Sequence, residues 1–284
     1  MKRNVLNSPR LVKLKKHRRR IVFSKIFLFL ISLSVIFLSL AYISRSEELN
    51  ISEIRVVGNK IIDASAVKIA VEKEITGYYL WVFPKTNIFF YPQNKIKNDL
   101  TLQFKRLKSI TLSVKNYKTL EISLIERTAL YTWCGNNIPD SQVNGEKELK
   151  CYFLDDSGYI FDEAPYFSGE VYFKFYGPAD IGTYFSKENF KQLIYFKDAL
   201  TTMDLKPVSL SILENERVKI FLSSNKTSKQ PYIIFKINSD FRKVAENLEI
   251  ALDTEPLLSN LKNKYSSLEY IDLRYGNKVY YKFR

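Results

Sequence analysis

The chain has 284 residues, 46% of them hydrophobic and 26% charged, which is the composition of a folded protein and excludes wholesale disorder. Its two Cys and one His are too few for a Cys-rich zinc site or a His-rich metal site. The formal net charge is +14, but 11 basic residues precede the first acidic residue, Glu47, and subtracting them leaves only +3 for residues 46–284. The net charge therefore does not predict nucleic-acid binding.

An uncharged apolar segment of 18 residues runs from Ile26 to Ile43, directly behind this basic tail. As a helix it spans roughly 27 Å, close to the thickness of the hydrocarbon core of a bilayer. The positive-inside rule places the basic residues in the cytoplasm. We therefore expect a cytoplasmic tail over residues 1–25 and a transmembrane helix over residues 26–44, with the rest of the chain outside the cytoplasmic membrane.

A cleaved signal peptide is the alternative, because Ser39-Leu40-Ala41 satisfies the small-x-small rule for cleavage. The long tail and the length of the apolar segment favour a retained anchor. The basic residues are then a topology signal and a contact for anionic lipid, so that residues 1–45 form the part of the chain that binds the membrane.

Residues 50–127 have the pattern of a small α+β domain. A short strand over residues 51–57 is followed by a helix over residues 63–77, which an Asp caps and a Gly ends. A second helix begins near residue 92, and two strands with alternating apolar residues follow at 110–114 and 120–124. The order β-α-α-β-β predicts two helices packed on a three-stranded sheet.

Residues 78–91, between the two expected helices, are rich in aromatic side chains and include Trp81. The segment is too short to span a membrane. We expect it to be buried between the helices and the sheet. Contact with the membrane surface or with a partner is the alternative.

Residues 128–284 predict a second α+β domain with a mostly antiparallel sheet. Residues 151–161 have a strand-turn-strand pattern, and Asp155 and Asp156 fall in the turn, where Asp is favoured because its side chain bonds nearby backbone. The other expected elements are helices at 187–203 and 240–253 and strands at 208–213, 218–222, 232–237, 268–273 and 279–283. The last strand ends the chain, so we expect it at an edge of the sheet.

Cys134 and Cys151 would lie outside the membrane, where disulfides persist. The 16 residues between them are polar and contain several turn signals. We hypothesise one disulfide that closes this loop and stabilises the domain by about 3 kcal/mol.

Five short motifs stand in a characteristic order along the chain. They are Gly58-Asn59, Glu126-Arg127, Ala129 to Trp133, the Leu-Asp-Asp-Ser-Gly-Tyr-Ile-Phe hairpin from Leu154, and Tyr270-Ile271-Asp272-Leu273-Arg274-Tyr275. With them, nearly the whole chain resembles the FtsQ/DivIB family of bacterial cell-division proteins. This family has an N-terminal transmembrane helix, a POTRA domain, which is a non-catalytic docking module, and a C-terminal β domain. The matching positions here are 26–44, 50–127 and 128–284. The POTRA-like part lacks the proline that the family often has in the turn between its last two strands.

The resemblance implies a scaffold at the division septum that is not an enzyme and uses no cofactor or metal. Its implied partners are FtsB/DivIC-type and FtsL-type coiled-coil proteins and, indirectly, the septal peptidoglycan synthases, with no nucleic acid expected. In the family a partner segment adds to this end of the last domain, and an edge strand offers free backbone groups for such pairing. The candidate partner-binding residues are Tyr275, Val279, Tyr280, Tyr281 and Phe283.

Asp272 and Arg274 stand two residues apart and therefore on one face of a strand. We expect them to form a structural ion pair that holds the sheet to a helix.

Two other functions are alternatives. A POTRA-containing chaperone of outer-membrane protein assembly or secretion carries its POTRA domain before a large β-barrel, and the roughly 155 residues that follow here cannot make one. A membrane-anchored cell-wall enzyme needs a catalytic centre, and we expect none, because we identify no Ser-x-x-Lys motif, no paired catalytic acids and no metal motif.

Overall fold

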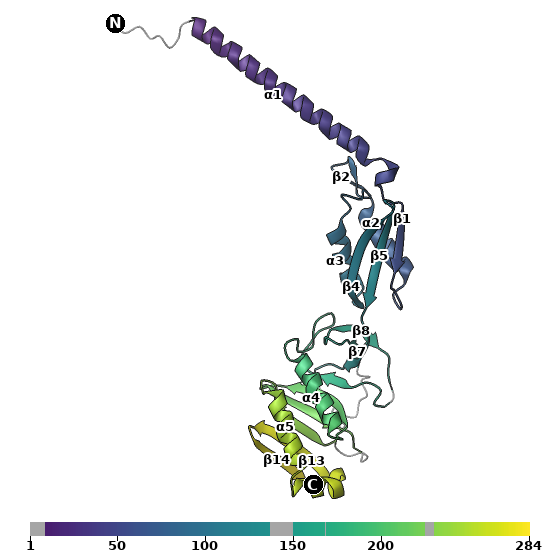
Figure 1. Ribbon diagram of the computed structural model, residues 1–284, viewed down its shortest axis with the longest axis vertical. Coiled ribbons are helices and arrows are strands. Elements are labelled where there is room, and N and C mark those ends of the chain that lie inside the picture. The colour runs from purple at the N-terminus through teal and green to yellow at the C-terminus, as the bar shows by residue number, and fades with distance from the viewer. Residues whose placement is uncertain (1–8, 137–149, 168, 225–229) are drawn as a thin grey trace, which may run out of the picture. The chain divides into compact units, whose positions relative to one another are not determined.

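The structure is a computed structural model that describes residues 9–136, 150–167, 169–224 and 230–284 (Figure 1). The first residues of the basic tail and most of the loop between the two Cys lie outside the described residues. The chain forms two compact units, Met1–Glu126 and Arg127–Arg284. The division falls one residue before the predicted one, and Arg127 belongs with the second unit.

The first unit begins with one long helix, α1 (Pro9–Ser44). From Lys13 to Ser44 it is long and apolar enough to cross a membrane, as an anchor or as a signal sequence. The helix begins well before residue 26, where the predicted membrane-spanning segment begins. Lys, Arg and Leu dominate residues 10–20, and these are good helix formers that extend an existing helix at little cost.

A three-stranded sheet with two helices follows α1. Its order is β1 (Glu53–Val57), β5 (Thr119–Glu126) and β4 (Leu107–Lys115), with β1 parallel and β4 antiparallel to β5. The helices are α2 (Ala64–Ile75) and α3 (Gln93–Gln103), and the Asp63 side chain accepts a hydrogen bond from the Ser65 N–H at the start of α2, as predicted. The buried core consists of apolar side chains from these five elements, including Val67, Val71, Ile96, Leu100, Leu120 and Ile122. The predicted β-α-α-β-β arrangement is confirmed.

The loop after β1 depends on Gly58 and on the last residue of β5. Gly58 has φ +81°, and a Cβ atom there would lie 2.3 Å from the carbonyl oxygen of Leu124. The Glu126 carboxylate accepts hydrogen bonds from the N–H groups of Lys60 at 2.6 Å and of Ile61 and Ile62 at 3.1 Å. The loop that begins at Gly58 and the end of β5, which both carry part of the resemblance, are therefore in direct contact.

Only part of the aromatic segment 78–91 is buried. Ile88 and Tyr91 pack against the core, as predicted, whereas most of the other aromatic rings are exposed, so the prediction is wrong for those rings. It contains a small hairpin, β2 (Tyr78–Tyr79) and β3 (Phe83–Pro84). Trp81, between the strands, is 92% exposed, and Phe89 is 72% exposed. The space beneath the sheet is already filled by α2 and α3, which pack against each other and on the sheet, so no room remains for these rings.

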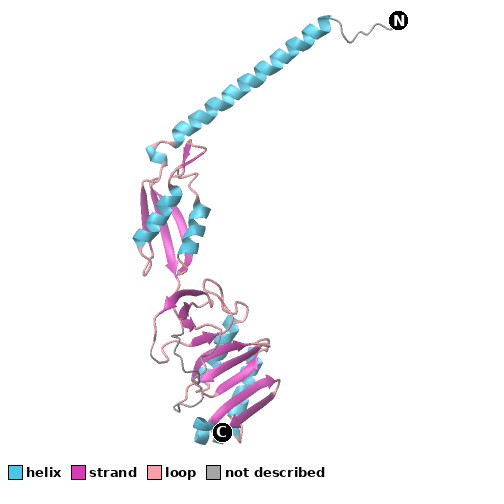
Figure 2. Cartoon of the chain, turned by 180° about the vertical axis from the view of Figure 1, so that it is seen from behind, coloured by secondary structure: helices cyan, strands magenta, loops and turns pink. Residues whose placement is uncertain are grey.

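The second unit is built on a mixed nine-stranded sheet of order β14-β13-β12-β11-β10-β9-β6-β7-β8 (Figure 2). Among the described residues five of its strand pairings are antiparallel and three are parallel. The strands are β6 (Tyr131–Trp133), β7 (Cys151–Leu154), β8 (Ile160–Ala164), β9 (Lys174–Tyr176), β10 (Pro207–Leu213), β11 (Arg217–Leu222), β12 (Tyr232–Lys236), β13 (Leu268–Tyr275) and β14 (Lys278–Phe283).

Two helices, α4 (Phe190–Thr202) and α5 (Phe241–Leu252), cover one face of this sheet (Figure 1). Phe196 of α4 and Phe241 of α5 both contact Phe235 of β12, with ring centres 4.7 and 5.4 Å apart. A third helix, α6 (Leu257–Lys264), follows α5. The two long helices and most of the strands match the prediction. β6 and β9 were not predicted, because strands of three residues carry too little periodicity, and α6 was not predicted either.

The turn between β7 and β8 is held by Asp155, which is almost fully buried. Its carboxylate accepts hydrogen bonds from the N–H groups of Ser157 at 2.8 Å and Tyr159 at 3.0 Å, and it forms an ion pair with Arg127. The Arg127 guanidinium also lies 3.7 Å from the centre of the Tyr159 ring. The predicted role of Asp155 in the turn is confirmed.

Candidate partner-binding edge of the sheet

The last strand, β14, is an edge of the nine-stranded sheet, as predicted. It pairs antiparallel with β13, and in the part of the chain that the structure describes no strand lies on its other side. An edge strand presents a row of backbone N–H and C=O groups that can pair with another chain. The strand is six residues long, which is sufficient for a partner strand to pair along its length.

The side chains of β14 divide between two faces of the sheet, because exposure alternates along the strand. Val279, Tyr281 and Phe283 are half-buried and pack at the margin of the hydrophobic core. Tyr280 is exposed and lies on the opposite face, beside Lys278 and Lys282. The five candidate residues thus contribute to two different surfaces.

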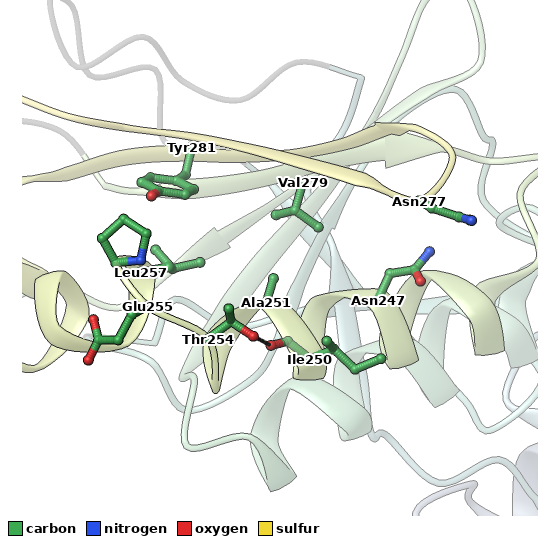
Figure 3. A pocket seen from close by; sticks show the side chains of 10 residues that line it. Asn247, Ile250, Ala251, Thr254, Glu255, Leu257, Asn277, Val279 and Tyr281 are labelled. Carbon is green, nitrogen blue, oxygen red and sulfur yellow. Dashed lines mark hydrogen bonds between the residues drawn. The ribbon is translucent and has the colours of Figure 1, made fainter.

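A hollow of about 280 Å³ lies between β14 and α5. Val279 points from the strand toward Ala251 of the helix, and the Tyr281 ring lies opposite Leu257 (Figure 3). Leu257 at the start of α6 and Pro256 before it complete the apolar part of the lining. Polar groups lie at the border of the hollow, where the Asn247 amide donates to the Gly276 carbonyl at 3.3 Å. The surface beside the edge can therefore accept apolar side chains of a bound segment.

The opposite face carries tyrosines at the end of the last hairpin. The rings of Tyr275 and Tyr280 meet edge to face with their centres 5.3 Å apart. The Arg274 guanidinium lies 5.5 Å from the centre of the Tyr275 ring. Tyr275 is 57% exposed and Tyr280 is 50% exposed. They form an aromatic surface next to the free edge.

Asp272 and Arg274 form the predicted ion pair, but the pair does not join the sheet to a helix. Arg274 donates through Nε at 2.9 Å and through Nη2 at 2.6 Å to the Asp272 carboxylate, whose residue is only 5% exposed. Both residues belong to β13. Ile271, which precedes them, and Leu273, which lies between them, face the helices. The alternation of a strand therefore places the ion pair on the face opposite the helices, where it fixes the backbone irregularity between Asp272 and Tyr275.

The environment on this face stabilises the ionised form of Arg274 at the hairpin. It destabilises the ionised form of Lys219 on β11. The hydrogen bonds to Asp272 raise the pKa of Arg274. Burial, and then the positive charges of Arg217 and Arg274, lower the pKa of Lys219, whose ammonium group lies 4.4 Å from the centre of the Tyr232 ring. Glu269 pairs with Lys282 across β13 and β14 at 2.8 Å. The last hairpin is thus held by ion pairs on one face and by the core on the other.

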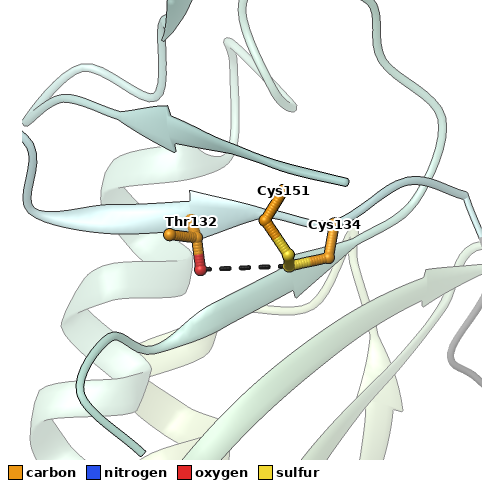
Figure 4. Close-up of a disulfide and its surroundings, with 3 residues drawn as sticks. All are labelled: Thr132, Cys134 and Cys151. Carbon is orange, nitrogen blue, oxygen red and sulfur yellow. Dashed lines mark hydrogen bonds between the residues drawn. A yellow bond between two sulfur atoms is a disulfide. The ribbon is translucent and has the colours of Figure 1, made fainter. Parts of the chain in front are cut away.

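Cys134 and Cys151 are joined in a disulfide (Figure 4). Cys134 directly follows β6 and Cys151 begins β7, and these two strands are antiparallel neighbours, which brings the Cα atoms within 4.1 Å. The Thr132 hydroxyl lies 4.0 Å from Sγ of Cys134. The disulfide lies in the β6–β7 half of the sheet, away from the β14 edge in strand order.

Residues that the sequence reasoning missed come from α5 and α6. Ile250 is 66% exposed, an unusual value for an apolar helix residue next to an open hollow, and the amphipathic pattern of α5 leaves it off the core face. The expectation that the sequence has no Ser-x-x-Lys motif is wrong, because this spacing occurs at Ser65–Lys68 and at Ser259–Lys262. The Ser259 hydroxyl donates to the Glu255 carboxylate at 2.6 Å, which is a local bond at the start of α6.

Comparison with known proteins gave no assignment. No protein-family model matches the chain, and no curated protein matches it. In the described ranges no three His, Cys, Asp or Glu side chains are grouped as metal ligands would be.

Proposed function

We propose that this chain is a membrane-anchored, non-enzymatic binding protein of the FtsQ/DivIB type. In this proposal α1 is a retained anchor with its N-terminus in the cytoplasm. The sheet and helices of the first unit are a POTRA docking domain, and the second unit is the C-terminal β domain of that family. The protein would act at the division septum, where it holds small coiled-coil division proteins and so helps to control septal peptidoglycan synthesis.

The observation that carries this proposal is the free edge of β14 beside the hollow under Val279 and Tyr281. A partner segment that adds as a strand gains affinity from backbone hydrogen bonds and specificity from pockets for its side chains. The edge supplies the first requirement and the hollow supplies the second. Tyr275, Tyr280 and Phe283 then border the added strand on its two faces and at its end.

The proposed direct partner is the extracytoplasmic segment of an FtsB/DivIC-type protein. An FtsL-type protein would be held through its coiled coil with that partner, and the peptidoglycan synthases would be reached only through the assembled complex. The resemblance along the chain and the order anchor, small helix-covered sheet, large sheet ending in a free edge both support this choice.

The test is calorimetric titration of the full chain in lipid nanodiscs with a peptide of the FtsB/DivIC-type segment from the same organism. We expect saturable 1:1 binding. Tyr281→Glu should weaken it by roughly 30-fold or more, the effect of losing one interfacial hot-spot residue. Ile250→Asp should weaken it as well, because it places a charge at the hollow without disturbing the core.

Ile69→Asp is the matched control, because Ile69 and Ile250 are both helical, apolar and 66% exposed, and Ile69 lies on α2 of the first unit. Its affinity should be that of the unchanged chain. Binding that survives both Tyr281→Glu and Ile250→Asp would move the site away from β14. A folded chain that binds no such segment would contradict the proposed function itself.

A further inference from the structure

The first unit exposes a group of large apolar side chains at the β2–β3 hairpin and in the segment after it. We call this group the aromatic hairpin surface. Its members and their exposed fractions are Tyr78 58%, Leu80 73%, Trp81 92%, Phe89 72% and Phe90 53%. Single exposed apolar residues are common, but a cluster of this kind marks a surface that contacts something else.

This surface adjoins the end of α1 that leads out of the apolar segment. The Phe83 ring contacts Phe37 of α1 edge to face, with ring centres 5.4 Å apart, and Phe90 contacts Phe83 at 6.1 Å. Nε of Arg45 donates to the Val82 carbonyl at 3.3 Å. Phe37 precedes the last residue of α1 by seven positions, which is about 10 Å along a helix. A hairpin that contacts Phe37 therefore lies alongside the last part of α1 and not only beyond its end.

The backbone of the hairpin indicates that folding alone does not select these side chains. The Val82 N–H bonds the Tyr79 carbonyl at 3.0 Å, and the two central residues of this turn, Leu80 and Trp81, have φ of 49° and 58°. Asn and Gly are the usual residues in such left-handed turns, and other residues are strained there. Leu80 and Trp81 are exposed despite this strain, so they gain nothing from the protein core.

We propose that the aromatic hairpin surface inserts into the interfacial layer of the bilayer that α1 crosses. The occupant is lipid at the level of the headgroups and the first acyl carbons, where Trp and Tyr rings are preferred. The inference rests on the proposed function only in requiring that α1 is a retained anchor. Phe37 is then at membrane depth, and the rings packed near it meet lipid without any movement of the unit.

The charges near the surface indicate that the contact is apolar rather than electrostatic. Arg45 and Lys85 are basic and lie over the Tyr78 and Tyr79 rings at 5.9 and 5.8 Å. Glu47 and Glu48 are exposed close to the same end of α1 and offset them. The insertion should therefore occur in neutral lipid and depend little on anionic lipid.

The test uses the fluorescence of Trp81, because the chain has only two Trp and the other, Trp133, is buried in the second unit. The full chain with Trp133→Phe is reconstituted in phosphatidylcholine vesicles. We expect emission at shorter wavelength than that of free tryptophan, protection from aqueous iodide, and loss of intensity when the lipid carries bromine on its acyl chains near the headgroup. Adding anionic lipid should change none of these.

The matched control moves the reporter to the loop after β1, at the end of the three-stranded sheet in the same unit. Ile61 is 69% exposed in the loop after β1, so Ile61→Trp with Trp81→Phe and Trp133→Phe should respond to iodide and not to brominated lipid. If Trp133→Phe fails to fold, the same quantity is obtained as the difference between the unchanged chain and Trp81→Phe.

Iodide quenching of Trp81 without lipid quenching would overturn the inference and leave the surface in water. Protection from both quenchers would also overturn it, because a protein contact would then cover the rings. Loss of the anchor is a separate result, since a chain that lacks α1 is released from the membrane by alkaline carbonate and has a lower intact mass.

Discussion

At the scale of single residues, Gly58 shows how one backbone position determines the conformation of the loop after β1. Its positive φ and its contact with the Leu124 carbonyl leave no space for a side chain. The following loop is then held by the Glu126 carboxylate, whose ionised form three backbone N–H groups favour. Burial opposes ionisation there, but these hydrogen bonds outweigh it and lower the pKa of Glu126.

We predict that Gly58→Ala destabilises the first unit by about 1–3 kcal/mol from backbone strain, with a further cost from the clash. Hydrogen exchange of β1 and β5 in the full chain measures it. Gly77→Ala is the control, because Gly77 also has a positive φ, +96°, but nothing lies within 4 Å of its added Cβ. Equal effects of the two changes would show that the contact with Leu124 contributes nothing.

A second residue-scale prediction concerns Asp155 and pH. Burial raises the pKa of Asp155, but the hydrogen bonds from Ser157, Tyr159 and Arg127 outweigh burial, and the pKa is lowered from its ordinary value of 3.8. A carboxylate with a lowered folded pKa stabilises the protein above its unfolded pKa, and this contribution is lost as the pH falls through the folded pKa.

Asp155→Asn should therefore destabilise the second unit at pH 7 by about 3 kcal/mol, since it also leaves Arg127 buried without its partner. The difference from the unchanged chain should shrink as the pH falls below about 4. Thermal unfolding over a pH series measures this, with the exposed Glu170→Gln as control. A difference that is constant with pH would show that the charge of Asp155 is not the cause.

At the scale of elements, the β6–β7 pair and the β13–β14 pair are stabilised in different ways. β6 and β7 are short and flank a long connection, and the Cys134–Cys151 disulfide joins them at its two ends. β13 and β14 are longer, are connected by a tight turn, and need no cross-link.

We predict that replacing both Cys by Ser lowers the stability of the second unit by about 3 kcal/mol, because the disulfide closes a loop with a sequence separation of 17. Chemical unfolding of the oxidised chain and of the double variant measures the difference. Reduction of the unchanged chain should reproduce it. Two free thiols in the chain isolated without reductant would contradict the pairing.

At the scale of the whole molecule, α1 decides whether the two units act at a membrane. We predict that the chain isolated from cells keeps its N-terminal methionine region and stays in the membrane after alkaline carbonate extraction. The reason is that α1 is longer and more apolar than the usual apolar part of a signal peptide. Intact mass spectrometry measures the N-terminus. A mature chain that begins at Tyr42 would show that the segment is a signal sequence.

Several elements could be predicted because their information is local. The cap at Asp63 and the alternating strands in the first unit appear where the sequence places them. The turn at Asp155 does as well. Short strands such as β9 could not be predicted, because they are defined by neighbours far away in the chain, as when Phe175 pairs with Leu210.

The candidate edge followed from the position of β14 at the end of the chain, whereas the hollow beside it did not. Ile250 and Tyr281 are far apart in sequence. They line the same hollow only because α5 packs on the sheet next to its last strand. The side of the sheet that Asp272 and Arg274 occupy was also misjudged, because the alternation gives which residues share a face but not which face the helices cover.

By itself the sequence determined the apolar segment at the N-terminus and the order of most elements. These depend on composition and periodicity within about 20 residues, which single-chain patterns report directly. Only the tertiary structure decided that Trp81 and its neighbours are exposed and that the last hairpin borders a hollow. Burial depends on which elements compete for the same face of a sheet, and for the aromatic segment α2 and α3 had already taken that face.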